Sequence, residues 1–303
     1  MKLPRLTAAD IQAVIPEVEE IGTPSKGGQK VVYPCKIDGE SYALKCMLAD
    51  PTGDSPDAET SIDAFDEVTA RARREVEIMR QVDSPHLVKL GPLPLTQAEI
   101  ADQNVIYFTE EWIDGDDLRE LLKTKGVFSI ADVIALGQQV TDAVECLWSL
   151  AKIHRDIKPG NIMRRATGEF VLLDMGLAFD LEDVSLSAAG QVPGTMIYFS
   201  PEQTEFTKKR QMDFRSDLFS LGIVLYEAAT GQHPFWSLGM NSHQALANIL
   251  ARAPDPPSSH RPEMPAELDE LIIRLLAKRP HLRYRTCAKL KTALDAIPTK
   301  SGS

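Results

Sequence analysis

The segment HRDIKPGN, which ends at Asn161, is the feature that most constrains what this chain can fold into. It places a carboxylate (Asp156), a cation (Lys158) and an amide (Asn161) on one short loop. Thirteen residues after Asn161, the tripeptide DMG begins with a second carboxylate, Asp174, directly after a short apolar run typical of a strand. HRD or DMG alone occurs in other sequences by chance, so the evidence is the order and spacing of the two motifs.

These residue types suit the transfer of a phosphoryl group from a metal-bound nucleotide. That reaction requires metal ions held against phosphate oxygens, a hydroxyl oriented in line with the leaving group, and positive charge over the transferring group. The two carboxylates, the amide and the lysine each fit one of these tasks.

A lysine lies on a predicted strand in the first part of the chain. Alternation in YALKCM places Ala43, Lys45 and Met47 on one face. Taken alone, such a lysine is most simply an edge-strand side chain that extends to water. Glu75, however, flanks a later apolar stripe at helical spacing and is placed to face inward. A buried carboxylate needs a cation, and Lys45 is the candidate.

Length and composition predict one enzyme of two lobes. A chain of 303 residues is near the size at which a single core divides. Its 25% charged and 43% hydrophobic residues are ordinary for a globular protein. A β-rich front followed by a mostly helical rear predicts the α+β class, with a small β-rich N-lobe and a larger helical C-lobe.

The predicted organisation is an N-terminal extension (1–15), an N-lobe (16–112), a C-lobe (113–298) and a tail (299–303). The segment 49–64 combines Pro, Gly, Ser and acidic residues and predicts a flexible insertion within the N-lobe. Two helix starts carry capping pairs, Thr7 with Asp10 and Ser129 with Asp132.

Charge and hydropathy argue against two classes of partner. The net charge of −11 is unsuited to a surface that gathers nucleic-acid phosphates. The sequence has no run of 18 or more apolar residues, and MKLPRLTAADIQ lacks the apolar region of a signal peptide. We therefore expect a cytoplasmic protein with no nucleic-acid partner and no membrane span. The oligomeric state is left open.

Together, the motifs resemble those of the eukaryotic-type (Hanks-type) serine/threonine protein kinases, whose signature includes the catalytic-loop string. The resemblance extends from about Ile21 to Thr286, and RSDLFSLGIVLYEAATGQHPF resembles bacterial members of the family. It implies the bilobal kinase fold, with ATP and Mg²⁺ as cofactors. It also implies transfer of the γ-phosphate to serine or threonine hydroxyls of protein substrates, with autophosphorylation.

The resemblance also implies catalytic roles. Lys45 resembles the strand lysine that contacts the α- and β-phosphates, and Glu75 resembles its helix partner. Asp156 resembles the catalytic base, and Lys158 the cation over the γ-phosphate. Asp217 resembles the acid at a helix start that supports the catalytic loop.

Further residues acquire binding roles in the same way. Asn161 and Asp174 are expected to hold the magnesium ions. The main chain between Glu111 and Ile113 would meet the adenine edge, and Asp117 the ribose. The full set expected at the nucleotide is Gly27, Lys30, Val32, Ala43, Lys45, Glu111, Ile113, Asp117 and Met163.

Thr195 and Glu202 resemble the end of an activation segment. Arg283, much later in the chain, is the expected ion-pair partner of Glu202. Ser185 and Ser187 are the candidate phosphorylation sites, because a phosphate there could form charge-assisted hydrogen bonds with Arg155, next to Asp156.

Two departures from the family pattern bear on activity. The glycine-rich loop keeps Gly27 but has Ser25 and Lys30 at its other two places, so it is either looser or binds phosphate through Lys30. Glu110 stands where the family has an apolar residue or Thr, and a carboxylate there needs a partner or takes a raised pKa.

Two other functions stay open from the sequence. One is a pseudokinase or regulatory binding module with weak or no catalysis, because the altered loop could blunt the reaction. The other is a small-molecule kinase of related fold. The activation segment and the SPE motif, which form a docking floor for a polypeptide, argue against the second.

Overall fold

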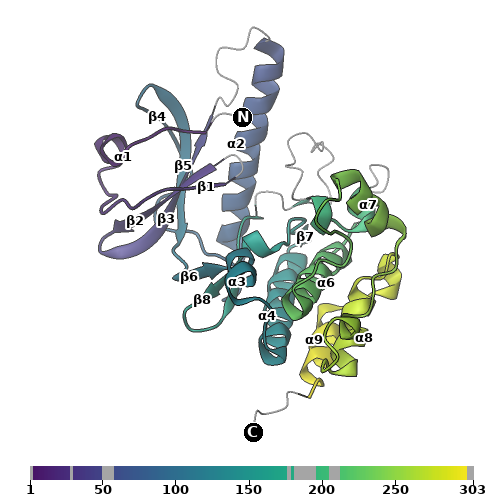
Figure 1. Cartoon of the computed structure of the whole chain (residues 1–303). Helices are drawn as coiled ribbons and strands as arrows, with labels where there is room; N and C mark the ends of the chain where they lie inside the picture. Colours follow the sequence, from purple (N-terminus) through teal and green to yellow (C-terminus); the bar gives the residue numbers. More distant parts are fainter. Residues whose placement is uncertain are drawn as a thin grey trace. The chain divides into compact units, whose positions relative to one another are not determined.

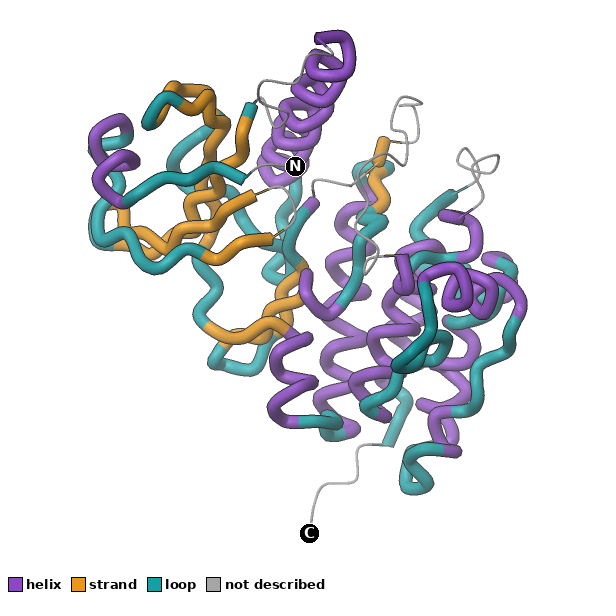
Figure 2. The backbone as a smooth tube through the Cα atoms, turned by 45° about the horizontal axis from the view of Figure 1, so that its top comes forward, coloured by secondary structure: helices purple, strands orange, loops and turns teal. Residues whose placement is uncertain are grey.

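The computed structural model describes residues 3–27, 30–49, 58–175, 179–180, 196–204 and 212–298. The protein is α+β and divides into two compact units. The sheet unit comprises Met1–Val82 and Val88–Ile113, and the helical unit comprises Asp83–Leu87 and Asp114–Ser303. Figure 2 shows that strands dominate the first unit and helices the second. The predicted lobe boundary, between residues 112 and 113, lies one residue before this division.

The sheet unit contains a five-stranded antiparallel sheet in the order β1-β2-β3-β5-β4. Its strands are β1 (Ser25–Gly27), β2 (Lys30–Ile37), β3 (Glu40–Leu48), β4 (Thr96–Ile100) and β5 (Gln103–Glu111). In an antiparallel sheet, side chains directly opposite one another share a face. The register between strands therefore decides which side chains meet.

The two faces of this sheet are covered by different helices (Figure 1). One face is apolar and packs against Leu6, Ile11 and Ile15, in and beside helix α1 (Ala8–Val14). The other carries Lys45 and is covered by α2 (Ala58–Gln81). The segment that the sequence marks as an N-terminal extension is thus part of the core of the sheet unit.

Helix α2 begins earlier than the sequence indicates. Residues 58–64 belong to it, so the prediction of a flexible insertion over 49–64 is wrong for this half. The Pro and Gly residues of the segment all precede Ala58, whereas AETSIDA contains good helix formers. Helix growth is cooperative, so the buried turns that follow extend the helix backwards. Residues 50–57 lie outside the described residues.

The helical unit is built around α4 (Ile130–Ser149) and α6 (Arg215–Thr230), which contact each other. Helix α4 begins after the predicted cap, where Ser129 Oγ accepts a hydrogen bond from Asp132 N at 3.1 Å. Helix α6 begins at Arg215, two residues before Asp217, the helix start expected from the sequence. The shorter helices are α3 (Leu118–Lys125), α5 (Pro201–Thr204), α7 (Ser242–Ala251), α8 (Ala266–Leu275) and α9 (Cys287–Asp295).

Short strands complete the helical unit. A three-stranded sheet has the order β6-β8-β9, and a second pair joins β7 to β10. These strands are β6 (Gly115–Asp117), β7 (Lys152–Ile153), β8 (Ile162–Arg165), β9 (Phe170–Leu172) and β10 (Phe179–Asp180). Leu87 forms a bridge to Leu172, which explains why residues 83–87 belong here. Among the helices that the structure describes, none combines the length and hydropathy of a membrane span.

Candidate active site

The hairpin of β8 and β9 holds Asn161 next to the segment that carries Asp174. Strand β8 begins directly after Asn161, and the antiparallel register pairs Ile162 with Leu172. Leu173 N then donates to Asn161 O at 2.8 Å. The two residues expected to hold magnesium therefore lie at the same end of one hairpin.

Asp156 is the centre of the hydrogen bonds in the preceding loop. Its Oδ2 accepts from Lys158 Nζ at 2.7 Å and from Asn161 Nδ2 at 2.8 Å. Its carbonyl oxygen accepts from the same Nδ2 at 2.9 Å. Burial raises the pKa of the Asp156 carboxyl, and the Lys158 cation opposes this shift. The carboxylate is thus fixed in direction by a cation and an amide.

Asp217, in the first turn of α6, supports this loop. Its two carboxylate oxygens accept from His154 N and Arg155 N, both at 2.8 Å. His154 Nδ1 accepts from Asp156 N at 3.3 Å, so its Nε2 carries the proton and donates to Leu173 O at 3.0 Å. Burial raises the pKa of Asp217 and lowers the pKa of His154. The loop is therefore tied both to α6 and to the end of β9.

Two residues of these segments have a strained backbone. Arg155 has φ 68° and Asp174 has φ 62°. Residues other than glycine seldom adopt positive φ, and such conformations persist only where the surrounding structure imposes them. At Arg155 the hydrogen bond from its N–H to Asp217 is one such constraint.

The oxygen donors of the hairpin suit magnesium. This ion prefers oxygen ligands and is commonly bound through one or two carboxylates together with substrate phosphates. Asn161 Nδ2 donates twice to Asp156, so Oδ1 is the amide atom that can accept a cation. Asp174 supplies a carboxylate from the same end of the hairpin.

In the sheet unit, Lys45 lies between two buried carboxylates. Its Nζ is 2.7 Å from Glu75 Oε1 and 2.6 Å from Glu110 Oε2. Lys30 Nζ lies 3.8 Å from the same oxygen of Glu75. Charged groups are costly to bury unless they are paired, so the inward-facing Glu75 has the partner that the sequence suggested. The sequence did not connect Glu110 with Lys45.

The strand register groups several residues expected at the nucleotide. Val32 pairs with Lys45 across β2 and β3, and Ala43 lies two residues before Lys45, so all three share one face. Gly27 pairs with Lys30 across β1 and β2.

The other residues expected at the nucleotide are divided between the two units. Glu111 ends β5, and Ile113 is the last residue of the sheet unit. In the helical unit, Asp117 pairs with Met163 across β6 and β8. Asp117 also caps α3, because its Oδ1 accepts from Glu120 N at 2.8 Å.

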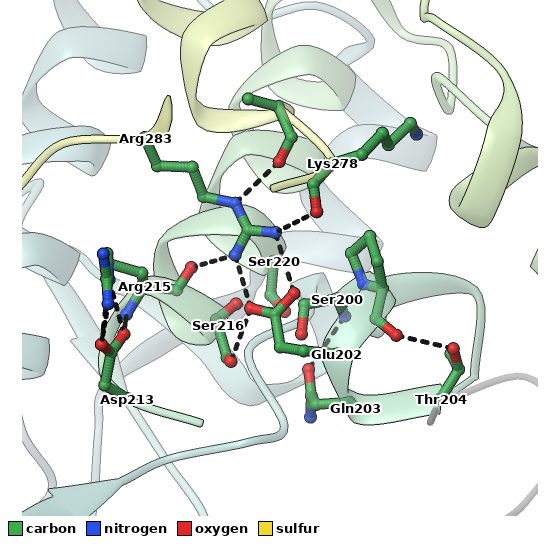
Figure 3. Close-up of polar contacts among 12 residues, drawn as sticks. Ser200, Glu202, Gln203, Thr204, Asp213, Arg215, Ser216, Ser220, Lys278 and Arg283 are labelled. Atoms are coloured by element: carbon green, nitrogen blue, oxygen red, sulfur yellow. Dashed lines mark hydrogen bonds and ion pairs between the residues drawn. The ribbon is translucent and has the colours of Figure 1, made fainter. Parts of the chain in front are cut away.

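Glu202 and Arg283 form the buried ion pair expected at the end of the activation segment (Figure 3). The two guanidinium NH groups donate to the two carboxylate oxygens at 2.6 and 2.9 Å. Arg283 also donates to the carbonyls of Arg215 at 2.6 Å and Ala277 at 2.9 Å. Ser216 Oγ donates to Glu202 Oε1 at 2.7 Å. The pair joins α5 to α6 and to the segment before α9.

Three residues named from the sequence, Thr195, Ser185 and Ser187, lie outside the described residues. Their roles stay predictions.

The sequence did not predict a buried polar cluster around Tyr198, four residues before Glu202. Tyr198 Oη donates to Glu227 Oε2 at 2.8 Å, and its ring meets the ring of His233 edge-on. Burial raises the pKa of Glu227 to about 7 and lowers the pKa of His233 to about 3. No local pattern connects Tyr198 with a residue on α6, so the sequence carried no signal for the cluster.

We expect Glu227 to lower the stability of the helical unit as the pH rises. Its pKa is about 7 in the folded protein, against 4.5 for an ordinary glutamate. Between these values the folded state binds the extra proton, so the contribution of Glu227 to the free energy of unfolding falls with increasing pH. The free energy of unfolding of the wild type, minus that of a Glu227→Gln variant, should therefore be larger near pH 5 than near pH 7.5.

Urea unfolding of both proteins at the two pH values measures this difference. His233 contributes the opposite pH dependence, but it is present in both proteins and cancels in the comparison. An unchanged stability difference between the two pH values would contradict the prediction.

Comparison with known proteins indicates the same family as the sequence motifs. Residues 17–293 match the family model of the protein kinase domain. The chain is similar to "Probable serine/threonine-protein kinase PknB" of Bifidobacterium longum, with 34% identity over 260 residues, which cover 84% of this chain and 35% of that protein. It is similar to "Serine/threonine-protein kinase PknB" of Mycobacterium leprae, with 33% identity over 233 residues, covering 77% and 36%. The chain thus spans about a third of the length of these relatives.

Proposed function

This chain belongs to the protein kinase family, and we propose that it transfers the γ-phosphate of ATP to serine or threonine hydroxyls of protein substrates, including its own. The observation that carries the proposal is the arrangement in the helical unit. There, Asp156 is fixed by Lys158 and Asn161, at the same end of the hairpin that presents Asp174. The proposal includes the cytoplasm as the location and protein rather than nucleic acid as the substrate.

In this proposal the helical unit performs the chemistry. Asp156 accepts the proton of the attacking hydroxyl, because its carboxylate is held in one direction by two donors. Lys158 stabilises negative charge on the transferring group. Asn161 and Asp174 would hold magnesium, which would supply positive charge against the phosphate oxygens.

The sheet unit binds the nucleotide. Lys45 contacts the α- and β-phosphates, and Glu75 orients it from α2 at 2.7 Å. Lys30 replaces a glycine of the usual loop and adds a second cation for the phosphates. Val32 and Ala43 share the face of Lys45, where they would pack on the adenine.

Incubation of the purified protein with labelled ATP, magnesium and a generic protein substrate tests the activity. Label should enter serine and threonine in the substrate and in the protein itself, and chelation of magnesium should abolish the transfer. Label should be absent from tyrosine. A folded protein that transfers no label under any of these conditions would remove the proposed activity.

Asp174 should make nucleotide binding depend on magnesium. In the wild type, magnesium should tighten ADP binding by roughly tenfold, about 1.4 kcal/mol, because the ion joins the carboxylate to the phosphates. An Asp174→Asn variant should bind ADP with the same affinity with or without the ion. Calorimetric titrations measure both affinities. If the variant keeps the full gain, Asp174 has no part in holding magnesium.

A further inference from the structure

Glu110 is a buried carboxylate for which the proposed reaction has no task. It ends a row of four charged side chains that alternate in sign, in the order Lys30, Glu75, Lys45 and Glu110. The successive distances are 3.8 Å from Lys30 Nζ to Glu75 Oε1, 2.7 Å from that oxygen to Lys45 Nζ, and 2.6 Å from Lys45 Nζ to Glu110 Oε2. As a group, the four side chains sum to zero charge when all are ionised.

The backbone on both sides of Glu110 holds it in place. Strand β5 pairs Glu110 with Ala43 and Phe108 with Lys45, so Glu110 and Lys45 are diagonal neighbours on one face. On its other side Glu110 forms a bridge to Leu90. Its side chain cannot leave this face unless the strand changes register.

Burial makes Glu110 dependent on Lys45. The residue is 4% exposed and Lys45 is 3% exposed, so water does little to neutralise either group. Burial raises the pKa of the Glu110 carboxyl, and the charge of Lys45 opposes that shift. The ionised form of an acid in this position becomes less stable when its cation moves to another partner.

We propose that Glu110 is a second counter-ion of Lys45 that competes with nucleotide phosphates for its ammonium group. This inference rests on the proposed function, in which Lys45 contacts the α- and β-phosphates. An ammonium group has three donors, and two carboxylates already lie against it. Contacts to the α- and β-phosphates would raise the number of acceptors to four, one more than the donors, so phosphate binding must weaken the contact with Glu110 and leave a buried acid less compensated.

The competition acts on phosphates and not on the nucleoside. Nucleotide phosphates bring negative charge to a group whose charges sum to zero, whereas loss of the Glu110 charge gives that group a net charge of +1. Adenosine carries no phosphate, so its affinity does not depend on this balance. The ratio of ADP affinity to adenosine affinity thus separates competition for Lys45 from a change in pocket shape.

Calorimetric titration of ADP with magnesium, and of adenosine, into a Glu110→Gln variant tests the inference. Glutamine keeps the shape of the side chain and removes its charge. The variant should bind ADP about tenfold more tightly than the wild type, and adenosine within about twofold of it. Its KM for ATP should fall while kcat stays within about threefold. The matched control is Glu99→Gln, which removes an equal charge from an exposed side chain on β4 and should change neither affinity.

A Glu110→Met variant provides a second route, because methionine fills a similar volume without charge. It should show the same gain for ADP over adenosine if Glu110→Gln fails to fold. Equal gains for ADP and adenosine, or no gain for ADP in the folded variants, would overturn the competition. A wild type that binds no ADP would instead overturn the proposed function itself, and this titration is carried out first.

Discussion

An Asp156→Asn variant is expected to transfer phosphate roughly a thousandfold more slowly than the wild type while binding nucleotide normally. Asparagine keeps an oxygen that can accept from Lys158 and Asn161, but it cannot take up the proton of a hydroxyl. The interaction lost exists only in the transition state, so kcat should fall and KM for ATP should stay the same. Steady-state kinetics with a protein substrate measures both constants.

The pH profile adds a second readout for Asp156. Burial raises its pKa above the ordinary value of 3.8. Activity of the wild type should therefore decline, as the pH is lowered, at a higher pH than a solvated aspartate would cause. The residual activity of the variant should lack this decline. Asp83→Asn, at an exposed site in the same unit, is the control and should retain full activity. An Asp156→Asn variant as fast as this control would exclude Asp156 as the base.

An Arg283→Met variant should lower the free energy of unfolding of the helical unit by about 3–5 kcal/mol. Arg283 is 1% exposed and donates to both oxygens of Glu202 (Figure 3). Methionine fills much of the volume but leaves a buried carboxylate without its counter-ion. Urea unfolding followed by tryptophan fluorescence measures the loss, because Trp148 packs on Phe214 within the helical unit at 5.3 Å between ring centroids.

Two further variants isolate the ion pair. Arg285→Met changes the same charge on an exposed side chain two residues later and should alter stability by less than about 0.5 kcal/mol. Replacing both partners, Glu202→Leu with Arg283→Met, should recover most of the loss, because no charge is then left buried alone. If the loss of stability in the double variant equals the sum of the losses from Glu202→Leu alone and Arg283→Met alone, the ion pair is not the cause of the loss.

Local sequence was sufficient for features that depend on neighbouring residues. The capping pairs at Thr7 and Ser129 were predicted and are present, because each hydrogen bond joins residues three apart. The catalytic-loop string contains Asp156 and its two donors within six residues, so its internal hydrogen bonds follow from proximity. The family, too, was identifiable from such strings in order.

Two long-range ion pairs were also within reach of the sequence. Lys45 with Glu75 was inferred from the rule that a buried charge requires a counter-ion, and Glu202 with Arg283 from the resemblance to the kinase family. The rule worked because Lys45 was the obvious cation for Glu75. It did not extend to Glu110, because Lys45 had already been assigned to Glu75.

The sequence by itself determined which groups are present for phosphate transfer, their order and the helix caps. Only the tertiary structure decided that Lys45 serves two acids, that Tyr198 meets Glu227, and that Asp174 adopts a positive φ. The physical reason is that strand register and helix packing join residues far apart in the chain. These contacts depend on which whole face of a strand or helix is buried, and not on a local pattern. The partners of a residue can therefore be identified only from the packed structure.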